Sequence, residues 1–257
     1  MREEYFNFWS NELGRQVEVK VYGFYGKPVL LFPCQGGRFF EAEDFGLINA
    51  ISDFIDAGKI KVFTVDSVDN EAWACTDPRV PLLQRAEMAD RYDSYITNEV
   101  APFIRAQCGG TDQKFATCGC SFGAFHSVNV MMRHPEIFDT CISLSGVLQL
   151  SDFVGDNFDD PTVAQKVRSH SPLLYIRDVA SSDPMRTNLL RQCHIVICSG
   201  QGAWEHMMLR DMAKMEPLLH EIGIPAWFDR WGIDVNHDWP WWKKQLPYFL
   251  GILCNTW

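Results

Sequence analysis

The sequence lacks the features that mark several classes of protein. No stretch comes near the about 18 uninterrupted apolar residues that a membrane span requires, and the N-terminal MREEYFNFWSNELGRQ has no apolar segment of a secretory signal. Lys and Arg form no cluster, and the 257 residues carry a net charge of −10, which disfavours binding to nucleic acid or to an anionic membrane surface. We therefore expect a soluble, cytoplasmic protein with no nucleic-acid or membrane partner.

Linkers and repeats are also missing. No Pro/Ser-rich segment, charge run or internal repeat divides the chain, and its apolar (47%) and charged (22%) fractions are those of a globular protein with a sizeable core. A chain of this length is within the range of one α/β domain. We therefore predict a single domain over residues 1–257.

Metal-binding patterns are absent as well. The sequence contains no CxxC or HxxxH pattern, and Cys118 and Cys120 are too close together to suggest a metal site. The nine cysteines are an odd number, and most of them lie in or beside apolar runs, so we interpret them as reduced, buried thiols. No metal or organic cofactor is expected.

The sequence does contain an alternation of strand and helix patterns. Residues 5–9 and 17–22 alternate polar and apolar side chains across a turn, which predicts an antiparallel hairpin. Apolar runs then alternate with helical patterns, which predicts a largely parallel sheet with helices on both faces. The predicted strands are 29–32, 60–65, 115–118, 140–144, 194–198 and 226–228, and the predicted helices are 45–57, 83–107, 205–222 and one from about 241.

Residues 148–190 do not follow this alternation. The segment is polar, contains Pro161, Pro172 and Pro184, and has weak periodicity. Long segments of this kind in compact domains often cover a functional site. We interpret it as an insertion outside the core that forms a small lid.

The strongest single pattern is Gly-Cys-Ser-Phe-Gly at residues 119–123, which fits GxSxG. An apolar strand precedes it, and a helix with Phe125, Val128 and Met132 at helical spacing follows. This is the context of a nucleophile elbow, in which a strained serine between strand and helix holds its hydroxyl clear of the sheet. GxSxG also arises by chance in glycine-rich turns, but the flanking strand and helix favour the elbow. Ser121 is therefore the candidate nucleophile.

A serine hydroxyl becomes a good nucleophile only when a histidine takes its proton and a carboxylate fixes the tautomer of that histidine. Two late predicted strands each end in a loop that carries a suitable residue, first Glu205 and then His237, in the order that α/β-hydrolases use. We predict Glu205 as the acid and His237 as the general base. Asp152 is an alternative acid, and Glu205 could instead be a favourable charge in the first turn of its helix.

The oxyanion hole needs two backbone N–H donors. One is expected from Phe122 at the helix start, and the other from Gln35 in the loop Pro33–Gly37, where two glycines allow close approach of the backbone. Cys34 adjoins the predicted oxyanion hole, and Cys120 adjoins the candidate nucleophile. Either oxidation of one of these thiols obstructs the site, or both thiols are unreactive and only fill space in the core.

Together these segments resemble the α/β-hydrolase superfamily and, within it, the esterase D-like group, which includes S-formylglutathione hydrolase, feruloyl esterases, siderophore esterases and mycolyltransferases. The resemblance rests on an N-terminal hairpin, GCSFG, RHPEIF, SLSG, SGQGAWE and HDWPWW. It implies a mostly parallel sheet with helices on both faces, and it aligns Ser121, Glu205 and His237 with the nucleophile, acid and base of the group. The usual His-Gly of the oxyanion loop is replaced here by Pro33-Cys34.

We therefore predict a serine carboxylesterase that hydrolyses small-molecule esters, with short acyl chains favoured, through an acyl-enzyme. An acyltransferase or thioesterase with the same intermediate is the first alternative, and a non-catalytic binding module with a hydrolase fold is the second. Trp204, Trp239 and Trp241 are candidates for substrate binding, although tryptophans at a helix start also serve as packing. The sequence leaves homo-oligomerisation open.

Overall fold

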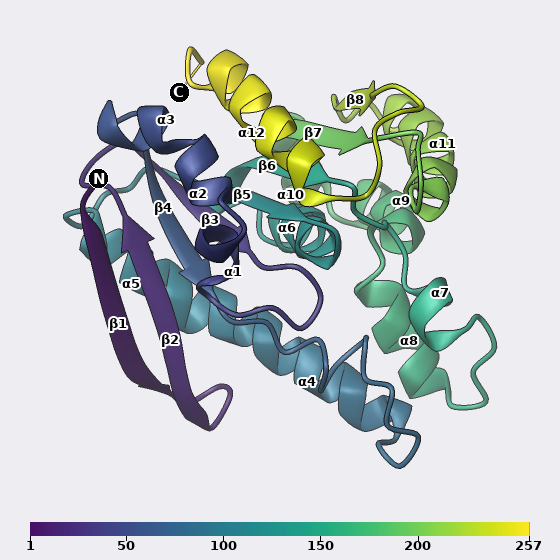
Figure 1. Cartoon of the computed structure of the whole chain (residues 1–257). Helices are drawn as coiled ribbons and strands as arrows, with labels where there is room; N and C mark the ends of the chain where they lie inside the picture. Colours follow the sequence, from purple (N-terminus) through teal and green to yellow (C-terminus); the bar gives the residue numbers. More distant parts are fainter. Residues whose placement is uncertain (257) are drawn as a thin grey trace.

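The computed structural model describes residues 1–256, which contain a mixed eight-stranded sheet in the order β1-β2-β4-β3-β5-β6-β7-β8 (Figure 1). β2 pairs antiparallel with β1 and with β4, and the remaining neighbours are parallel. The strands are β1 Glu3–Ser10, β2 Arg15–Tyr22, β3 Lys27–Phe32, β4 Ile60–Val65, β5 Phe115–Cys120, β6 Phe138–Leu144, β7 His194–Ser199 and β8 Trp227–Arg230. The predicted hairpin and the largely parallel sheet are both confirmed.

Helices cover both faces of the sheet. The helices are α1 Glu41–Asp44, α2 Leu47–Ala50, α3 Ser52–Asp56, α4 Leu82–Tyr95, α5 Ala101–Gln107, α6 Phe122–Arg133, α7 Ser151–Val154, α8 Pro161–Ser169, α9 Pro172–Ser182, α10 Pro184–Leu190, α11 His206–Glu221 and α12 Trp239–Leu253. One buried cluster joins the sheet to α4, α5, α6, α9 and α11, and a second joins it to α2, α3 and α12. Figure 1 shows α12 beside α2, with α4 across the sheet from them.

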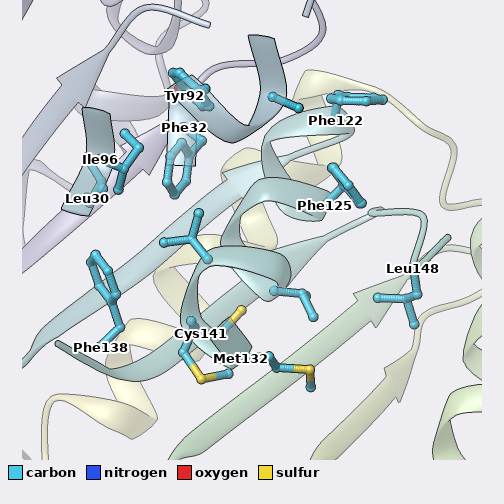
Figure 2. Close-up of a cluster of buried hydrophobic side chains, with 14 of the residues drawn as sticks. Leu30, Phe32, Tyr92, Ile96, Phe122, Phe125, Met132, Phe138, Cys141 and Leu148 are labelled. Carbon is cyan, nitrogen blue, oxygen red and sulfur yellow. The ribbon is translucent and has the colours of Figure 1, made fainter. Parts of the chain in front are cut away.

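The two clusters follow from the alternation of side chains along the central strands. In β5, Phe115 belongs to the first cluster, whereas Ala116, Cys118 and Cys120 belong to the second. Figure 2 shows part of the first cluster, in which side chains of β3, α4, α6 and β6 meet. β3, β4 and β5 are buried over their whole length because both faces are covered.

Two predicted helices differ from the observed ones. Residues 45–57, which we expected to form one helix, are divided between α2 and α3. Gly46 has a left-handed φ of 76° just before α2, and Ile51 leaves the helical region between the two helices. The predicted helix 83–107 is continuous, but it widens into a π-helical turn over Ile96–Val100 (η1), just before Pro102 removes a backbone donor.

The segment 148–190 consists of the four helices α7–α10, and part of it joins the core. Val163, Val167, Ile176 and Val179 are buried in the first cluster, so the expectation that the whole segment lies outside the core was wrong. The loop between α7 and α8 is largely exposed. A lid role for the segment stays a prediction.

Within residues 1–256, no helix is both long and apolar enough to cross a bilayer.

Candidate active site

Ser121 lies between β5 and α6 in a strained backbone conformation, with φ 56° and ψ −123°. A left-handed φ is uncommon for a residue with a side chain, and such strain occurs most often at functional sites. The flanking glycines are required for steric reasons. A Cβ at Gly119 would lie 2.3 Å from the carbonyl carbon of Gly123, and a Cβ at Gly123 would lie 2.4 Å from the oxygen of Pro33. The five residues therefore form the tight strand-to-helix turn that the pattern predicts.

The loop between β8 and α12 brings His237 to this turn. Its Nε2 lies 2.8 Å from Ser121 Oγ, within hydrogen-bond distance. The backbone N–H of His237 donates to the oxygen of Ala203 at 3.0 Å, which ties its loop to the loop after β7. The ring of Trp242 packs edge-on against the imidazole, with centroids 5.0 Å apart. His237 is thus fixed both through its backbone and through its ring.

Glu205 lies at the end of the loop that precedes α11 and is completely buried. Ser145 donates to its Oε1 at 2.5 Å, and Ser199 donates to its Oε2 at 2.7 Å. The distance from Oε1 to His237 Nδ1 is 3.7 Å, and Nδ1 is buried without a hydrogen-bond partner in the described residues. Catalytic hydrogen bonds are often long in the absence of substrate and shorten when it binds. The carboxylate therefore has two fixed donors and faces an unpaired Nδ1.

Ser145 and Ser199 were not among the predicted site residues. Each lies at the end of a parallel strand, Ser199 as the last residue of β7 and Ser145 directly after β6. The SLSG and SGQGAWE segments contain them. The sequence of these segments does not predict which carboxylate accepts the hydrogen bonds of the two hydroxyls. Ser145 also accepts a hydrogen bond from Trp242 Nε1 at 3.1 Å.

The alternative acid is engaged elsewhere. Asp152 on α7 forms a paired interaction with Arg210 of α11, with Nη1 3.0 Å from Oδ1. Its pKa is lowered, chiefly by the hydrogen bond from Arg210. The geometry therefore favours Glu205 over Asp152 as the partner of His237.

The loop that follows β3 and the start of α6 each present a backbone N–H that has no acceptor in the described residues. The N–H of Cys34 donates to Glu41 Oε2 at 2.7 Å, and the N–H of Gly36 donates to Asp69 Oδ2 at 3.1 Å. Between them, the N–H of Gln35 has no acceptor within residues 1–256. The N–H of Phe122, at the first position of α6, likewise donates to no group that the structure describes.

Five aromatic residues near these loops differ in their packing. Trp242 is buried, which makes it a packing residue. Trp239 stacks on Phe45, with the rings nearly parallel and their centroids 4.6 Å apart. Trp241 is half-buried, and Trp204, next to Glu205 in sequence, is 75% exposed and has a left-handed φ of 69°. An exposed, strained tryptophan contributes little to packing, so Trp204 stays a candidate for substrate contact.

The two cysteines near the site are held as thiols. Burial, followed by the nearby Glu41, raises the pKa of Cys34 far above its ordinary value, and burial likewise raises the pKa of Cys120. Because the thiolate is the reactive form, both groups are poor nucleophiles. The arrangement favours the interpretation that they fill space. Within residues 1–256, no three His, Cys, Asp or Glu side chains are grouped so that they could hold a metal ion.

Comparison with known proteins identifies a family for the chain. A family model described as "Putative esterase" matches residues 10–251. No curated protein is detectably similar to the chain in sequence.

Solved structures of similar fold cover nearly the whole chain. A ferulic acid esterase has a TM-score of 0.74 at 16% identity, with 100% of this chain and 99% of that one covered. An S-formylglutathione hydrolase from Staphylococcus aureus has a TM-score of 0.72 at 14% identity, with 98% of each chain covered. A fluorophosphonate-binding serine hydrolase from the same organism has a TM-score of 0.71 at 14% identity, again with 98% of each chain covered. At such low identity the likeness establishes the α/β-hydrolase fold.

Proposed function

The chain belongs to the Esterase family and is a hydrolase of the ester-cleaving kind, and we propose that it works through an acyl-enzyme formed on Ser121. The observation that supports this most directly is the 2.8 Å distance between Ser121 Oγ and His237 Nε2 at the strained strand-to-helix turn. A nucleophile and a base at hydrogen-bond distance are the minimal requirement for covalent catalysis by serine.

In the proposed reaction, Ser121 Oγ attacks the ester carbonyl carbon while His237 Nε2 accepts the hydroxyl proton. The N–H groups of Gln35 and Phe122 stabilise the oxyanion of the tetrahedral intermediate. His237 then donates the proton to the leaving alcohol, which leaves an acyl-serine. A water molecule gives its proton to His237 and attacks the acyl group, and the carboxylic acid is released when Ser121 takes the proton back.

Glu205 is proposed to hold the His237 imidazole in the correct tautomer and to stabilise its cationic form. The hydroxyls of Ser145 and Ser199 already orient the carboxylate. When substrate binds, a movement of less than about 1 Å would bring the 3.7 Å separation from His237 Nδ1 into hydrogen-bond range. Short acyl chains, a role for Trp204, Trp239 and Trp241 in substrate binding, and a cytoplasmic location stay predictions.

A p-nitrophenyl ester series from acetate to palmitate tests the proposal. The native protein is expected to hydrolyse the short esters, and Ser121→Ala is expected to lose this activity. Ser181→Ala, which removes an exposed hydroxyl on α9, is the matched control and should behave like the native protein. A fluorophosphonate probe should label the native protein and the control but not Ser121→Ala.

Retention of esterase activity or probe labelling by Ser121→Ala would refute the assignment of the nucleophile. Product analysis with an added alcohol distinguishes hydrolysis from transfer, because an acyltransferase would form the new ester faster than the free acid.

A further inference from the structure

A buried Asp–His pair next to the active site has no part in the reaction described above. Asp69, in the loop between β4 and α4, is completely buried, and its Oδ1 accepts a hydrogen bond from Nε2 of His126 at 2.7 Å. The imidazole of His126 lies among aromatic rings, 5.7 Å from Phe32, 5.2 Å from Tyr92 and 5.3 Å from Phe122 between centroids. Figure 2 shows Phe122 at the start of α6, with Phe32 of β3 and Tyr92 of α4 to one side of the helix. Asp69 is thus the polar partner of a histidine with otherwise aromatic surroundings.

The second oxygen of Asp69 reaches a different element. Oδ2 accepts the N–H of Gly36, in the loop that follows β3, at 3.1 Å. One carboxylate therefore joins that loop to α6, the helix that carries His126 and begins at Phe122. These are the two elements that supply the proposed oxyanion donors.

A second carboxylate holds the same loop on the other side of Gln35. Glu41 Oε2 accepts the N–H of Cys34 at 2.7 Å. Of three consecutive amides, the outer two are thus bound to carboxylates and the central one is left without an acceptor. Because each peptide unit is planar, fixing the N–H groups on either side leaves the central N–H little freedom to rotate.

We infer that Asp69 is a positioning residue for the proposed oxyanion hole, which it orders by holding Gly36 and His126 at a fixed separation. Glu41 assists from the far side of the loop. The inference rests on the proposed function, because it assumes that the N–H of Gln35 receives the oxyanion. Asp69 touches neither substrate nor nucleophile and acts through the backbone that it holds.

The role is geometric rather than electrostatic. A negative carboxylate near a developing oxyanion is unfavourable by itself, so the benefit of Asp69 must come from the two hydrogen bonds that it accepts. A neutral side chain of the same shape should therefore serve nearly as well. In Asp69→Asn the side-chain oxygen can accept the N–H of Gly36, while the amide NH₂ donates to His126 in its other tautomer.

Three variants test the inference, with active sites counted by fluorophosphonate titration so that misfolded protein does not enter kcat. Asp69→Ala should lower kcat by about 10- to 100-fold with KM changed less than about twofold, since small misplacements of catalytic groups have effects of that size. Asp69→Asn should stay within about threefold of the native kcat. Glu43→Ala removes a carboxylate of α1 that binds Lys20 and Tyr22 instead of the loop, and it should leave kcat unchanged.

A second measurement separates positioning from a purely structural role. A trifluoromethyl ketone forms a tetrahedral adduct with a nucleophilic serine, and the adduct places its oxyanion in the hole. For Asp69→Ala, the inhibition constant of this ketone should rise by the same factor by which kcat/KM falls. A structural role would lower the titrated fraction of active protein but leave the inhibition constant of that fraction unchanged.

The inference is overturned if Asp69→Ala keeps kcat per active site within threefold, or if its ketone inhibition constant equals that of the native protein. Equal losses in Asp69→Asn and Asp69→Ala would also overturn it, because the charge rather than the geometry would then matter. Failure of the proposed function has a different signature, namely activity or probe labelling that survives Ser121→Ala.

Discussion

Replacement of Gly123 by alanine tests the packing that holds Ser121, the proposed nucleophile, next to the loop that follows β3. A Cβ at this position would lie 2.4 Å from the oxygen of Pro33 and 2.5 Å from the oxygen of Phe32. Both atoms belong to the backbone at the end of β3 and cannot turn away as a side chain would. The substitution must therefore separate the start of α6 from the end of β3.

The size of the effect follows from the geometry. An ordinary carbon–oxygen contact of about 3.3 Å requires a displacement of roughly 0.9 Å from the present separation. Misplacement of catalytic groups by about 1 Å can lower the rate about 100-fold, and over-packing typically destabilises a protein by about 1–3 kcal/mol. We expect Gly123→Ala to fold with a lowered melting temperature and to lose about 100-fold in kcat for p-nitrophenyl acetate.

Gly251→Ala is the matched control. Gly251 lies inside α12, where a Cβ would meet only Phe54 at 3.9 Å, so alanine should stabilise the helix by up to about 1 kcal/mol without affecting the rate. The assay compares kcat per fluorophosphonate-titrated site with thermal unfolding for the three proteins. If Gly123→Ala retained kcat within threefold of the native value, the reasoning from the close contact of α6 and β3 would be refuted.

Two further predictions concern stability. Ser145→Ala removes a hydrogen bond to the buried Glu205 and leaves Trp242 Nε1 without its acceptor, so the free energy of unfolding measured in urea should fall by about 2 kcal/mol, and a loss below 0.5 kcal/mol would contradict this. Burial tends to raise the pKa of Asp90, but hydrogen bonds from His170 and Lys166 outweigh it and lower the pKa from 3.8 to about 2. The stabilisation is therefore present above about pH 4 and disappears as the pH falls towards 2. In urea titrations the difference between the native protein and Asp90→Asn should shrink over that range, and a constant difference would count against the linkage.

The parts of the site that the sequence predicts are those set by short segments. The elbow at Ser121 is recognised from five consecutive residues where a strand meets a helix. The contact that requires Gly119 lies within this segment, whereas the contact that requires Gly123 is with the backbone of Pro33. The positions of Glu205 and His237 follow from the rule that site loops lie at the carboxyl ends of parallel strands. Strand pattern and chain order were therefore sufficient to select the loops that the fold brings together.

Other features depend on neighbours that are distant in sequence. The hydrogen bonds of Glu205 with Ser145 and of Asp69 with Gly36 join loops that no local pattern relates. The division of residues 45–57 was missed because helical spacing says nothing about the non-helical backbone that Ile51 adopts between α2 and α3. The burial of Val167 was missed because α8 has only a short apolar face, and the polar residues around it make its helical periodicity weak.

The arrangement of site loops on separate strands also has a kinetic consequence for folding. The contact of Ser121 with His237 spans 116 residues of sequence, and that of Ser145 with Glu205 spans 60. Contacts of such range close only after the intervening chain has ordered, and they slow folding. A chain that has not yet added β7 and β8 to the sheet therefore holds Ser121 with neither His237 nor Glu205 beside it. During refolding, the return of esterase activity should mark completion of the sheet at its β8 edge, later than the return of helical signal.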